Sequence, residues 1–462
     1  MDCMGGFGLA ARGDSGADDA ASRGSDKQPL PLVLHEHNRP YQEYQPEGGC
    51  SYFAEWGVWE QDYHVADIPA QNPDSYFVCL SAHRGPNETL FHQSPLGWLT
   101  LQAECRGKKA HEVTLYDHYA AVERAYPGDA PVDPLKGNIG QLVRLKLARP
   151  ELKVLVSIGG WLMSDPFFTL ANDPQARKVF VASVLRFLQR YPVFDGVDID
   201  WEYPGGGALP YLGSDKDYQG YAQLMADLRQ ALNRLGQRRG RRYQLTAAVS
   251  ASPERIPAAN HARAARYLDY VFAMTYDFYG AWNSTLGHHA ALHASATQRL
   301  PAYDAASAVR GLLQAGIPAD KLVLGVALYG RGWSRVRQVA PGESPFLHGR
   351  GTRPLHGTWE PGILDYRAIR EHYMRNSRQG KNGYRFTYDP QAEAPYLWNA
   401  ASGKLISFEN PRSARAKGRF VRQQHLAGVF SWEIDADNGD LLNAMHEGLG
   451  HPRIRAGAAG AP

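Results

Sequence analysis

Short runs of apolar residues recur along the chain from residue 52 to residue 432, and amphipathic stretches separate them. Several runs are nearly continuous (KVLVSI, YVFAM, KLVLGVAL), which is typical of parallel strands covered on both faces. We predict eight strands, at residues 52–56, 75–80, 153–158, 196–201, 244–249, 270–274, 322–327 and 428–432. Helical periodicity between them predicts helices at residues 141–148, 177–190, 218–235, 305–315 and 413–424.

This repeated alternation of strands and helices predicts an α/β fold, a (β/α)₈ TIM barrel. Two intervals, residues 81–140 and 333–405, are too long for ordinary connections, and the second is rich in aromatic residues. We predict a small α+β insertion domain at 333–405, so that the barrel comprises 46–332 and 406–450. The remaining segments, 1–45 and 451–462, are expected to be flexible tails because they lack amphipathic periodicity.

Composition narrows the function classes. The 462 residues are 44% hydrophobic and 21% charged, which is typical of a globular protein. Lys and Arg number 50 against 47 Asp and Glu, so the formal charge of +3 argues against a nucleic-acid or membrane-surface binder. The basic run GQRRGRR (236–242) is therefore interpreted as a solvated helix end. No apolar run reaches the ~18 residues of a membrane span, and the first forty residues contain no recognisable secretory signal.

Cysteine and acidic motifs give no indication of a metal or cofactor. The four cysteines (Cys3, Cys50, Cys79, Cys105) are too few for a disulfide scaffold; Cys79 and Cys105 could form a bridge or remain two buried thiols. No C-x-x-C or His/Cys cluster predicts a zinc site. The segment DADNGD (435–440) superficially resembles a calcium loop, but its Gly comes one position early and His446 stands where the Glu should be. We interpret it as a polar start to the last barrel helix.

The most informative segment is FDGVDIDWEYPGG, residues 194–206. Asp198, Asp200 and Glu202 are spaced two apart, so on a strand they project from one face, roughly 6–7 Å apart. The alternate residues are apolar and suit contact with the surrounding helices. Buried carboxylates repel one another, and burial penalises each charge, so stability alone would not select this row. A solvated acidic strand face and a Mg²⁺ or Ca²⁺ site are the other interpretations, and no converging ligands support the metal.

DGVDIDWE resembles the DxxDxDxE signature of family 18 glycoside hydrolases, the chitinases. Further segments resemble that family in the expected order, closest to the bacterial chitinase A subgroup: KVLVSIGGW (153–161), YVFAMTYDFYGAW (270–282), LGVALYGRGW (324–333) and GVFSWEIDADNGD (428–440). The segment GTWEPG resembles the insertion domain of this subgroup. The resemblance covers roughly residues 50 to 450 and implies hydrolysis of β-1,4 bonds in chitin, with no cofactor, by an extracellular enzyme that acts as a monomer on chitin and chito-oligosaccharides.

The resemblance also implies a mechanism in which the 2-acetamido oxygen of the substrate attacks the anomeric carbon. Glu202 would protonate the glycosidic oxygen, and Asp200 would hydrogen-bond the acetamide N–H and stabilise the oxazolinium ion. Asp198 would share a proton with Asp200, because close carboxylates do not ionise independently. Tyr276 would donate a hydrogen bond to the acetamide oxygen. Asp277 and Arg331 are candidates for contacts with neighbouring sugars.

Supporting and substrate-binding residues follow from the same motifs. Ser157 is expected to hydrogen-bond Asp198 from the neighbouring strand or simply to pack there, and Asp195 to make structural hydrogen bonds at the start of its strand. Substrate-binding candidates at or after strand ends, or in the insertion, are Trp56, Trp161, Tyr203, Met274, Trp282, Tyr329, Trp359 and Trp432. Core packing is the alternative for any one Trp, and for Met274 it is the preferred role. Stacked rings could contribute on the order of 1 kcal/mol each, which favours processive cleavage to the disaccharide.

One departure and two alternatives remain. In SASPERIP (250–257), Pro253 stands where the subgroup has a Lys after the fifth strand, so any sugar contact from that Lys is in doubt. The subgroup's fibronectin-like domain before the barrel is not evident in the sequence. The alternative functions are a chitin-binding lectin that has lost catalysis, and an endo-β-N-acetylglucosaminidase that acts on N-glycans. The intact Glu202 favours an enzyme over a lectin, and the aromatic insertion favours a chitinase.

Overall fold

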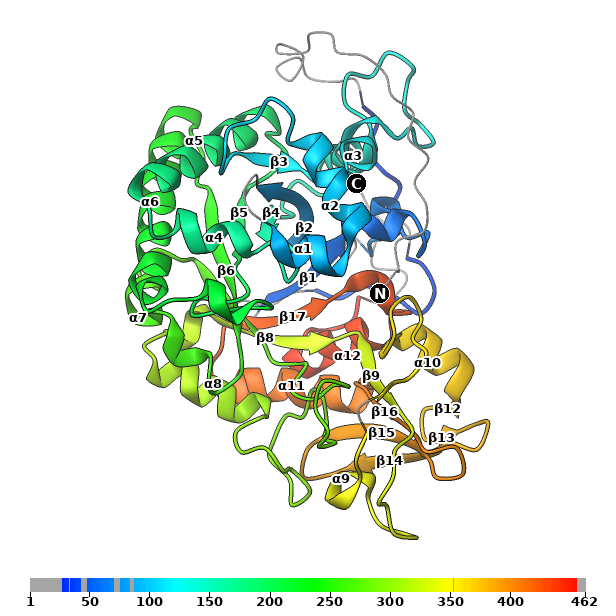
Figure 1. Ribbon diagram of the computed structural model, residues 1–462. Coiled ribbons are helices and arrows are strands. Elements are labelled where there is room, and N and C mark those ends of the chain that lie inside the picture. Colours follow the sequence, from blue (N-terminus) through cyan, green and yellow to red (C-terminus); the bar gives the residue numbers. More distant parts are fainter. Residues whose placement is uncertain are drawn as a thin grey trace. The chain divides into compact units, whose positions relative to one another are not determined.

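The computed structural model of the protein describes residues 27–32, 34–42, 48–69, 75–83, 87–351 and 353–454. Contacts within the chain divide it into two compact units. Unit 1 comprises Met1–Leu32, Ala54–Ile68 and Phe77–Leu245, and unit 2 comprises Val33–Phe53, Pro69–Tyr76 and Thr246–Pro462. Each unit contributes parallel strands that alternate with helices (Figure 1).

Unit 1 contains the strands β4 (Val154–Gly159) and β5 (Gly196–Asp200), which pair in parallel with Ser157 opposite Asp198. The short strand β3 (Val113–Leu115) pairs antiparallel with β2 (Ser75–His83). The helices of this unit are α1 (Glu88–Gln93), α2 (Pro95–Glu104), α3 (Gly137–Ala148), α4 (Asp165–Leu170), α5 (Pro174–Arg190) and α6 (Lys216–Arg239). Between β2 and α3, the described residues therefore form the helices α1 and α2, the strand β3 and a five-residue π-helix, Tyr119–Glu123.

Unit 2 contains a parallel series in the order β1–β17–β8–β7–β6. These strands are β1 (Gly48–Ala54), β6 (Gln244–Ser250), β7 (Tyr270–Met274), β8 (Leu322–Ala327) and β17 (Gly428–Trp432). The helices between and after them are α7 (His261–Ala264), α8 (Ala305–Gln314), α11 (Pro411–Gln423) and α12 (Asp440–Leu449). All eight strands predicted from the apolar runs are thus present, and three of the eight (β7, β8 and β17) end at the predicted residue.

The segment between β8 and α11 folds into a separate antiparallel sheet, in the order β10–β9–β16–β15–β14, with β11 also paired to β9. Its strands are β9 (Tyr329–Ser334), β10 (Arg353–Pro354), β11 (Ile363–Asp365), β14 (Arg385–Asp389), β15 (Ala394–Asn399) and β16 (Lys404–Ser407). It also holds α9 (Pro345–His348), α10 (Tyr366–Tyr373) and the short pair β12 (Met374–Asn376) and β13 (Gln379–Gly380). Figure 1 shows these strands in yellow and orange. The sheet begins at Tyr329 and its last strand ends at Ser407, and the insertion predicted at residues 333–405 falls within this range.

Local sequence explains why the elements begin where they do. Asp173 caps α5, because its carboxylate accepts hydrogen bonds from the backbone N–H groups of Gln175 (2.7 Å) and Ala176 (3.4 Å), and Pro174 supplies a preset first turn. The apolar stripe of α5, which includes Phe180 and Val184, is buried. The segment DADNGD predicts a polar start to α12, and the structure agrees. The Asp437 carboxylate accepts hydrogen bonds from Leu441 N (3.2 Å) and Leu442 N (3.0 Å) in the first turn.

Several expectations for the ends and cysteines can be compared with the structure. Residues 27–32 and 34–42 fall within the expected tail, yet Lys27, Leu30 and Tyr41 are buried. Cys50 and Cys105 are also buried, whereas the side chain of Cys79 and the whole of Cys3 lie outside the described residues, as do 1–26 and 455–462. In the part of the chain that the structure describes, no helix is both long and apolar enough to cross a membrane.

Candidate active site

Asp198 and Asp200 of the carboxylate row lie on β5, every residue of which is buried, and Glu202 follows two positions after the strand ends. Asp198 is fully buried and Asp200 is 7% exposed. Val197, Ile199 and Trp201 alternate with them and belong to the core; the Trp201 ring stacks on Phe167 with centroids 5.7 Å apart. Trp201, the last of these apolar residues, is therefore packed against helix α4.

Hydrogen bonds and charge define the state of Asp198 and Asp200. The Ser157 hydroxyl on β4 donates to Asp198 Oδ2 at 2.9 Å, which confirms the expected hydrogen bond. Asp200 Oδ1 has no hydrogen-bond partner among the described residues. Burial, and then the nearby charges of Glu202 and Asp198, raise the pKa of Asp200 well above its usual value. A carboxyl held this way retains a proton at a pH where a solvated Asp has lost it.

Glu202 lies just beyond β5, half-buried, and its peptide bond to Tyr203 is cis. The Ser164 hydroxyl accepts from Glu202 N at 2.8 Å, and it lies within hydrogen-bond distance of Gly160 O (2.8 Å) and Asp200 O (3.1 Å). Ser164 therefore connects the loop after β4 to the loop after β5 and fixes the backbone of the candidate acid. The sequence analysis did not identify Ser164, because a lone serine in a loop carries no distinctive signal.

The glycine pair after β4 is required by close packing against the same strand end. Gly159 has φ +118°, and a Cβ at this position would approach Asp200 O to 2.1 Å. The Gly160 N–H donates to the same carbonyl oxygen at 2.7 Å. Trp161, which follows directly, is 45% exposed and available for contact with a ligand.

Asp195 lies at the opposite end of the strand and makes structural contacts. Its carboxylate accepts from Val154 N at 2.9 Å and from Arg241 Nη2 at 2.6 Å, and it forms a short ion pair with Lys146. These contacts join the starts of β4 and β5 to the segment after α6. Arg241, part of the basic run interpreted as a solvated helix end, therefore binds the protein itself, while Arg238, Arg239 and Arg242 are exposed.

Unit 2 carries the Tyr276 motif after β7. Asp277 adopts a left-handed conformation (φ +57°) and pairs with Arg331 through two hydrogen bonds, Nε to Oδ1 and Nη2 to Oδ2, both 2.7 Å. Burial would raise the pKa of Asp277, but the Arg331 guanidinium outweighs it and holds the pKa well below the usual value. Arg331 also lies over the Trp282 ring, 4.9 Å from its centroid. The two residues predicted to contact sugars thus form a fixed ion pair beneath an exposed aromatic ring.

Aromatic side chains surround Tyr276. Its ring meets those of Tyr329 (6.1 Å) and Phe430 (6.0 Å) edge to face. Tyr276 and Trp432 both pack on the buried cluster that contains Tyr329. Met274, Tyr276 and Trp432 are half-buried, so each retains some exposed surface, and the Trp432–Glu433 peptide is cis. The structure therefore brings together the unit 2 residues that the motifs predicted.

His289 is a buried neighbour that the sequence analysis did not identify. Its ring lies 5.3 Å from that of Tyr329, and Nδ1 is 3.7 Å from Asp277 Oδ1. Burial lowers the pKa of His289, although the Asp277 charge opposes the shift. Neither ring nitrogen of His289 has a hydrogen-bond partner within the described part of the chain.

Two further acidic residues, Glu433 and Asp435, follow Trp432. From the sequence, the segment 435–440 was interpreted only as a polar start to the last barrel helix. Burial, with Asp365 as the next contribution, raises the pKa of Asp435 to about 7, and burial with Asp435 and Asp365 raises that of Glu433. Trp359 in the insertion donates from Nε1 to Asp365 Oδ2 at 2.9 Å. No group of three or more His, Cys, Asp or Glu in the described part of the chain is arranged to hold a metal ion.

The remaining candidates are placed individually. Trp282 is 59% exposed, Tyr203 is half-buried, and Trp56 lies half-buried on the 3₁₀ helix Glu55–Val58 that follows β1.

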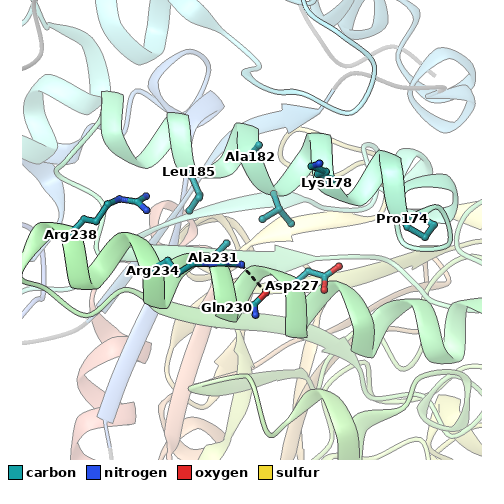
Figure 2. A pocket seen from close by; sticks show the side chains of 10 residues that line it. Pro174, Lys178, Ala182, Leu185, Asp227, Gln230, Ala231, Arg234 and Arg238 are labelled. Atoms are coloured by element: carbon teal, nitrogen blue, oxygen red, sulfur yellow. Dashed lines mark hydrogen bonds between the residues drawn. The ribbon is translucent and has the colours of Figure 1, made fainter.

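A groove of about 300 Å³ between α5 and α6 is lined by Lys178, Leu185, Asp227 and Arg238 among others (Figure 2). None of its lining residues belongs to the carboxylate row or to the aromatic candidates, so we do not assign it to this site.

Comparison with known proteins gives one consistent result. The family model described as glycosyl hydrolases family 18 matches residues 51–437. The chain is 41% identical over 459 residues to chitinase A of Pseudoalteromonas piscicida, covering 93% of this chain and 56% of that protein. It is 40% identical to a chitinase of Autographa californica nuclear polyhedrosis virus, covering 92% and 76%.

Solved structures agree. Chitinase ChiA74 from Bacillus thuringiensis matches with a TM-score of 0.77 and 30% identity, covering 90% of this chain and 71% of that one. The catalytic domain of a psychrophilic chitinase B from Arthrobacter TAD20 matches with a TM-score of 0.71 and 26% identity, covering 87% and 95%. Together with the parallel strands and intervening helices, these matches confirm the predicted (β/α)₈ barrel fold.

Proposed function

Because the chain belongs to glycosyl hydrolases family 18, we propose that it hydrolyses β-1,4 bonds between N-acetylglucosamine units of chitin. The observation that carries this proposal is the row of carboxylates at the end of β5, in which Asp198 is fully buried, Asp200 is nearly so, and Glu202, just beyond the strand, is half-buried. A carboxyl whose pKa is raised by burial and then by two acidic neighbours has little structural value and suits proton and charge management during catalysis.

The proposed reaction proceeds in two steps with retention of configuration. In the first, Glu202 donates its proton to the glycosidic oxygen while the substrate's acetamide oxygen attacks the anomeric carbon, so that the leaving sugar departs and an oxazolinium ion forms. In the second, a water molecule gives a proton to the Glu202 carboxylate and adds to the anomeric carbon, whose bond to the acetamide oxygen breaks, so that the acetamide group is restored. Two inversions at that carbon give net retention.

Each remaining residue of the row has a proposed role in this sequence. Asp200 accepts a hydrogen bond from the acetamide N–H, and the negative charge that it gains stabilises the positive oxazolinium ion. Asp198 takes up the proton that Asp200 releases and is itself oriented by Ser157. Tyr276 donates to the acetamide oxygen as it attacks. The Asp277–Arg331 pair offers polar contacts to a neighbouring sugar, and the rigid bidentate geometry supports such a positioning role.

We further propose that cleavage is processive and yields mainly the disaccharide, by an extracellular enzyme that acts as a monomer without a cofactor. The exposed rings of Trp161 and Trp282 support the processive part, because stacked sugar rings can hold a chain between successive cleavages. Long oligomers scattered from the earliest time points on crystalline chitin would contradict it.

The product anomer tests the mechanism. Cleavage of chitotetraose followed by proton NMR is expected to release the β-anomer first, and initial formation of the α-anomer would refute retention. Chitosan and an N-glycoprotein serve as comparison substrates, because preferential release of N-glycans would support an endo-β-N-acetylglucosaminidase instead.

A further inference from the structure

Exposed apolar side chains gather on the α1–α2 segment of unit 1. The inner residues of these helices, Leu90 and Leu101, are buried in one cluster with Cys105. On the outer side, Leu96 and Leu99 are exposed. A surface helix normally confines its apolar residues to the buried face, and a contiguous exposed patch marks an interaction surface. The packing of unit 1 does not account for these outer residues.

Aromatic rings extend this patch at both ends of α1. Phe91 is 48% exposed and meets Trp98 edge to face at 5.4 Å. At the start of α1, the Tyr211 hydroxyl forms a short hydrogen bond with Glu88, and its ring is 68% exposed. At the end of α1, Trp161 Nε1 donates to Gln93 Oε1 at 3.2 Å. Three exposed rings are therefore arranged around one short helix.

The helix that carries them is fixed firmly. Thr89 donates its backbone N–H and its hydroxyl to the two carboxylate oxygens of Asp165, both at 2.7 Å, and both residues are buried. Asp165 begins α4, which directly follows the Trp161 loop. Tyr211 lies in the segment that joins Glu202 to α6. The patch is thus continuous with the two loops that carry the proposed acid and the Trp161 ring.

We propose that the exposed rings of Phe91 and Tyr211, with the half-buried Trp98 supporting Phe91, continue the Trp161 surface as an accessory site that holds the face of insoluble chitin; this inference rests on the proposed function. Flat exposed rings suit the C–H faces of an extended array of pyranose rings, whereas a single sugar would need an enclosing pocket. The polar side chains of Glu88, His92 and Gln93 beside the rings can hydrogen-bond hydroxyl and acetamide groups.

The double variant Phe91→Ala/Tyr211→Ala tests the proposal, with Tyr270→Ala at the start of β7 as a control for loss of an exposed aromatic ring. Each ring is expected to contribute roughly fivefold, so the apparent Kd for β-chitin particles rises about 25-fold. The kcat/KM for soluble chitotetraose stays within about twofold of wild type, and the control variant binds chitin as wild type does. Thermal unfolding confirms that all variants are folded.

Three results would overturn the proposal. Wild-type affinity for chitin particles in the double variant would show that the patch does not bind the polymer. An equal loss of kcat/KM on soluble chitotetraose would assign the rings to the catalytic groove. A shift from dimer to monomer in sedimentation, without a change in chitin affinity, would show that a second copy of the chain covers the patch. Failure of the wild type to cleave any chitin substrate would instead refute the proposed function itself.

Discussion

Replacing Asp200 by Asn should make the protein more stable and nearly inactive. Asp200 is 7% exposed, Oδ1 has no hydrogen-bond partner among the described residues, and both Asp198 and Glu202 repel its charge. A neutral amide of the same shape removes that repulsion. Because an unsatisfied buried polar or charged group costs about 1–3 kcal/mol, we expect Asp200→Asn to gain about 1–2 kcal/mol in free energy of unfolding at pH 7.

The pH dependence gives this prediction its sign. The pKa of Asp200 is raised in the folded state, so above the unfolded value of about 3.9 the folded protein holds a proton that the unfolded chain has lost. Wild-type stability therefore falls as the pH rises from about 4 toward the raised pKa. At pH 4 the unfolded chain still holds about half of this proton, so the penalty is small and Asp200→Asn should nearly match the wild type. The advantage should appear only as the pH rises.

Two measurements check the prediction together. Urea unfolding of wild type and Asp200→Asn at pH 4 and pH 7 gives the stability difference at each pH. Initial rates on chitotetraose give the activity, which should fall by at least about 100-fold, or roughly 2.7 kcal/mol of transition-state stabilisation. A variant that is no more stable at pH 7 than at pH 4, relative to wild type, would refute the electrostatic reasoning. Turnover close to wild type would refute the catalytic role.

Three further predictions concern positioning contacts. Arg331→Ala should lower the free energy of unfolding in urea at pH 7 by about 2–3 kcal/mol, which is less than breaking a fully buried ion pair would cost because the Asp277 side chain is 32% exposed. The double variant Arg331→Ala/Asp277→Asn should recover most of this loss, and no recovery would contradict the pairing. Lys417 and Glu409 form an ion pair whose side chains are both fully buried. Lys417→Met should lower the free energy of unfolding by about 3–5 kcal/mol because it leaves the Glu409 carboxylate buried without its partner, and a loss under 1 kcal/mol would contradict this. Ser164→Ala should lower kcat on chitotetraose about tenfold with little change in KM, and a change in KM alone would argue against positioning of the acid.

Much of the fold was predictable because apolar periodicity is a local signal. The boundaries of β7, β8 and β17 match the predicted residues, since each is a short, nearly continuous apolar run. The predicted first strand was placed late: residues 52–56 were expected, but β1 is Gly48–Ala54, and Trp56 lies on a 3₁₀ helix. The sequence alone does not show where the strand ends and the 3₁₀ helix begins, because the aromatic residues at the end of the run are compatible with either conformation.

The carboxylate row was predictable for a similar reason, because a spacing of two on a strand fixes which side chains share a face. Partners far apart in the sequence were not. Asp277 and Arg331 were each predicted to contact sugars, and the structure shows that they bind one another across 54 positions. Ser164 and His289 had no distinguishing pattern, because their importance arises only from what folding places beside them.

The general acid is tested by Glu202→Gln, which should lower turnover of chitotetraose by three or more orders of magnitude while oligosaccharide binding is largely retained. Glu151→Gln, an exposed surface change, serves as the matched control and should behave as wild type. Residual turnover within about tenfold of wild type would place the acid at another residue.

In the proposed mechanism the nucleophile is the substrate's own acetamide oxygen, and a series of fluorinated substrates can test this role. Aryl chitobiosides that carry N-acetyl, N-fluoroacetyl, N-difluoroacetyl and N-trifluoroacetyl groups on the reacting sugar differ progressively in the nucleophilicity of that oxygen. We predict that kcat/KM falls at each step, by at least about 100-fold across the series. A kcat/KM that is independent of fluorine content would show that an enzyme carboxylate or water attacks instead, and would contradict the proposed attack by the acetamide oxygen.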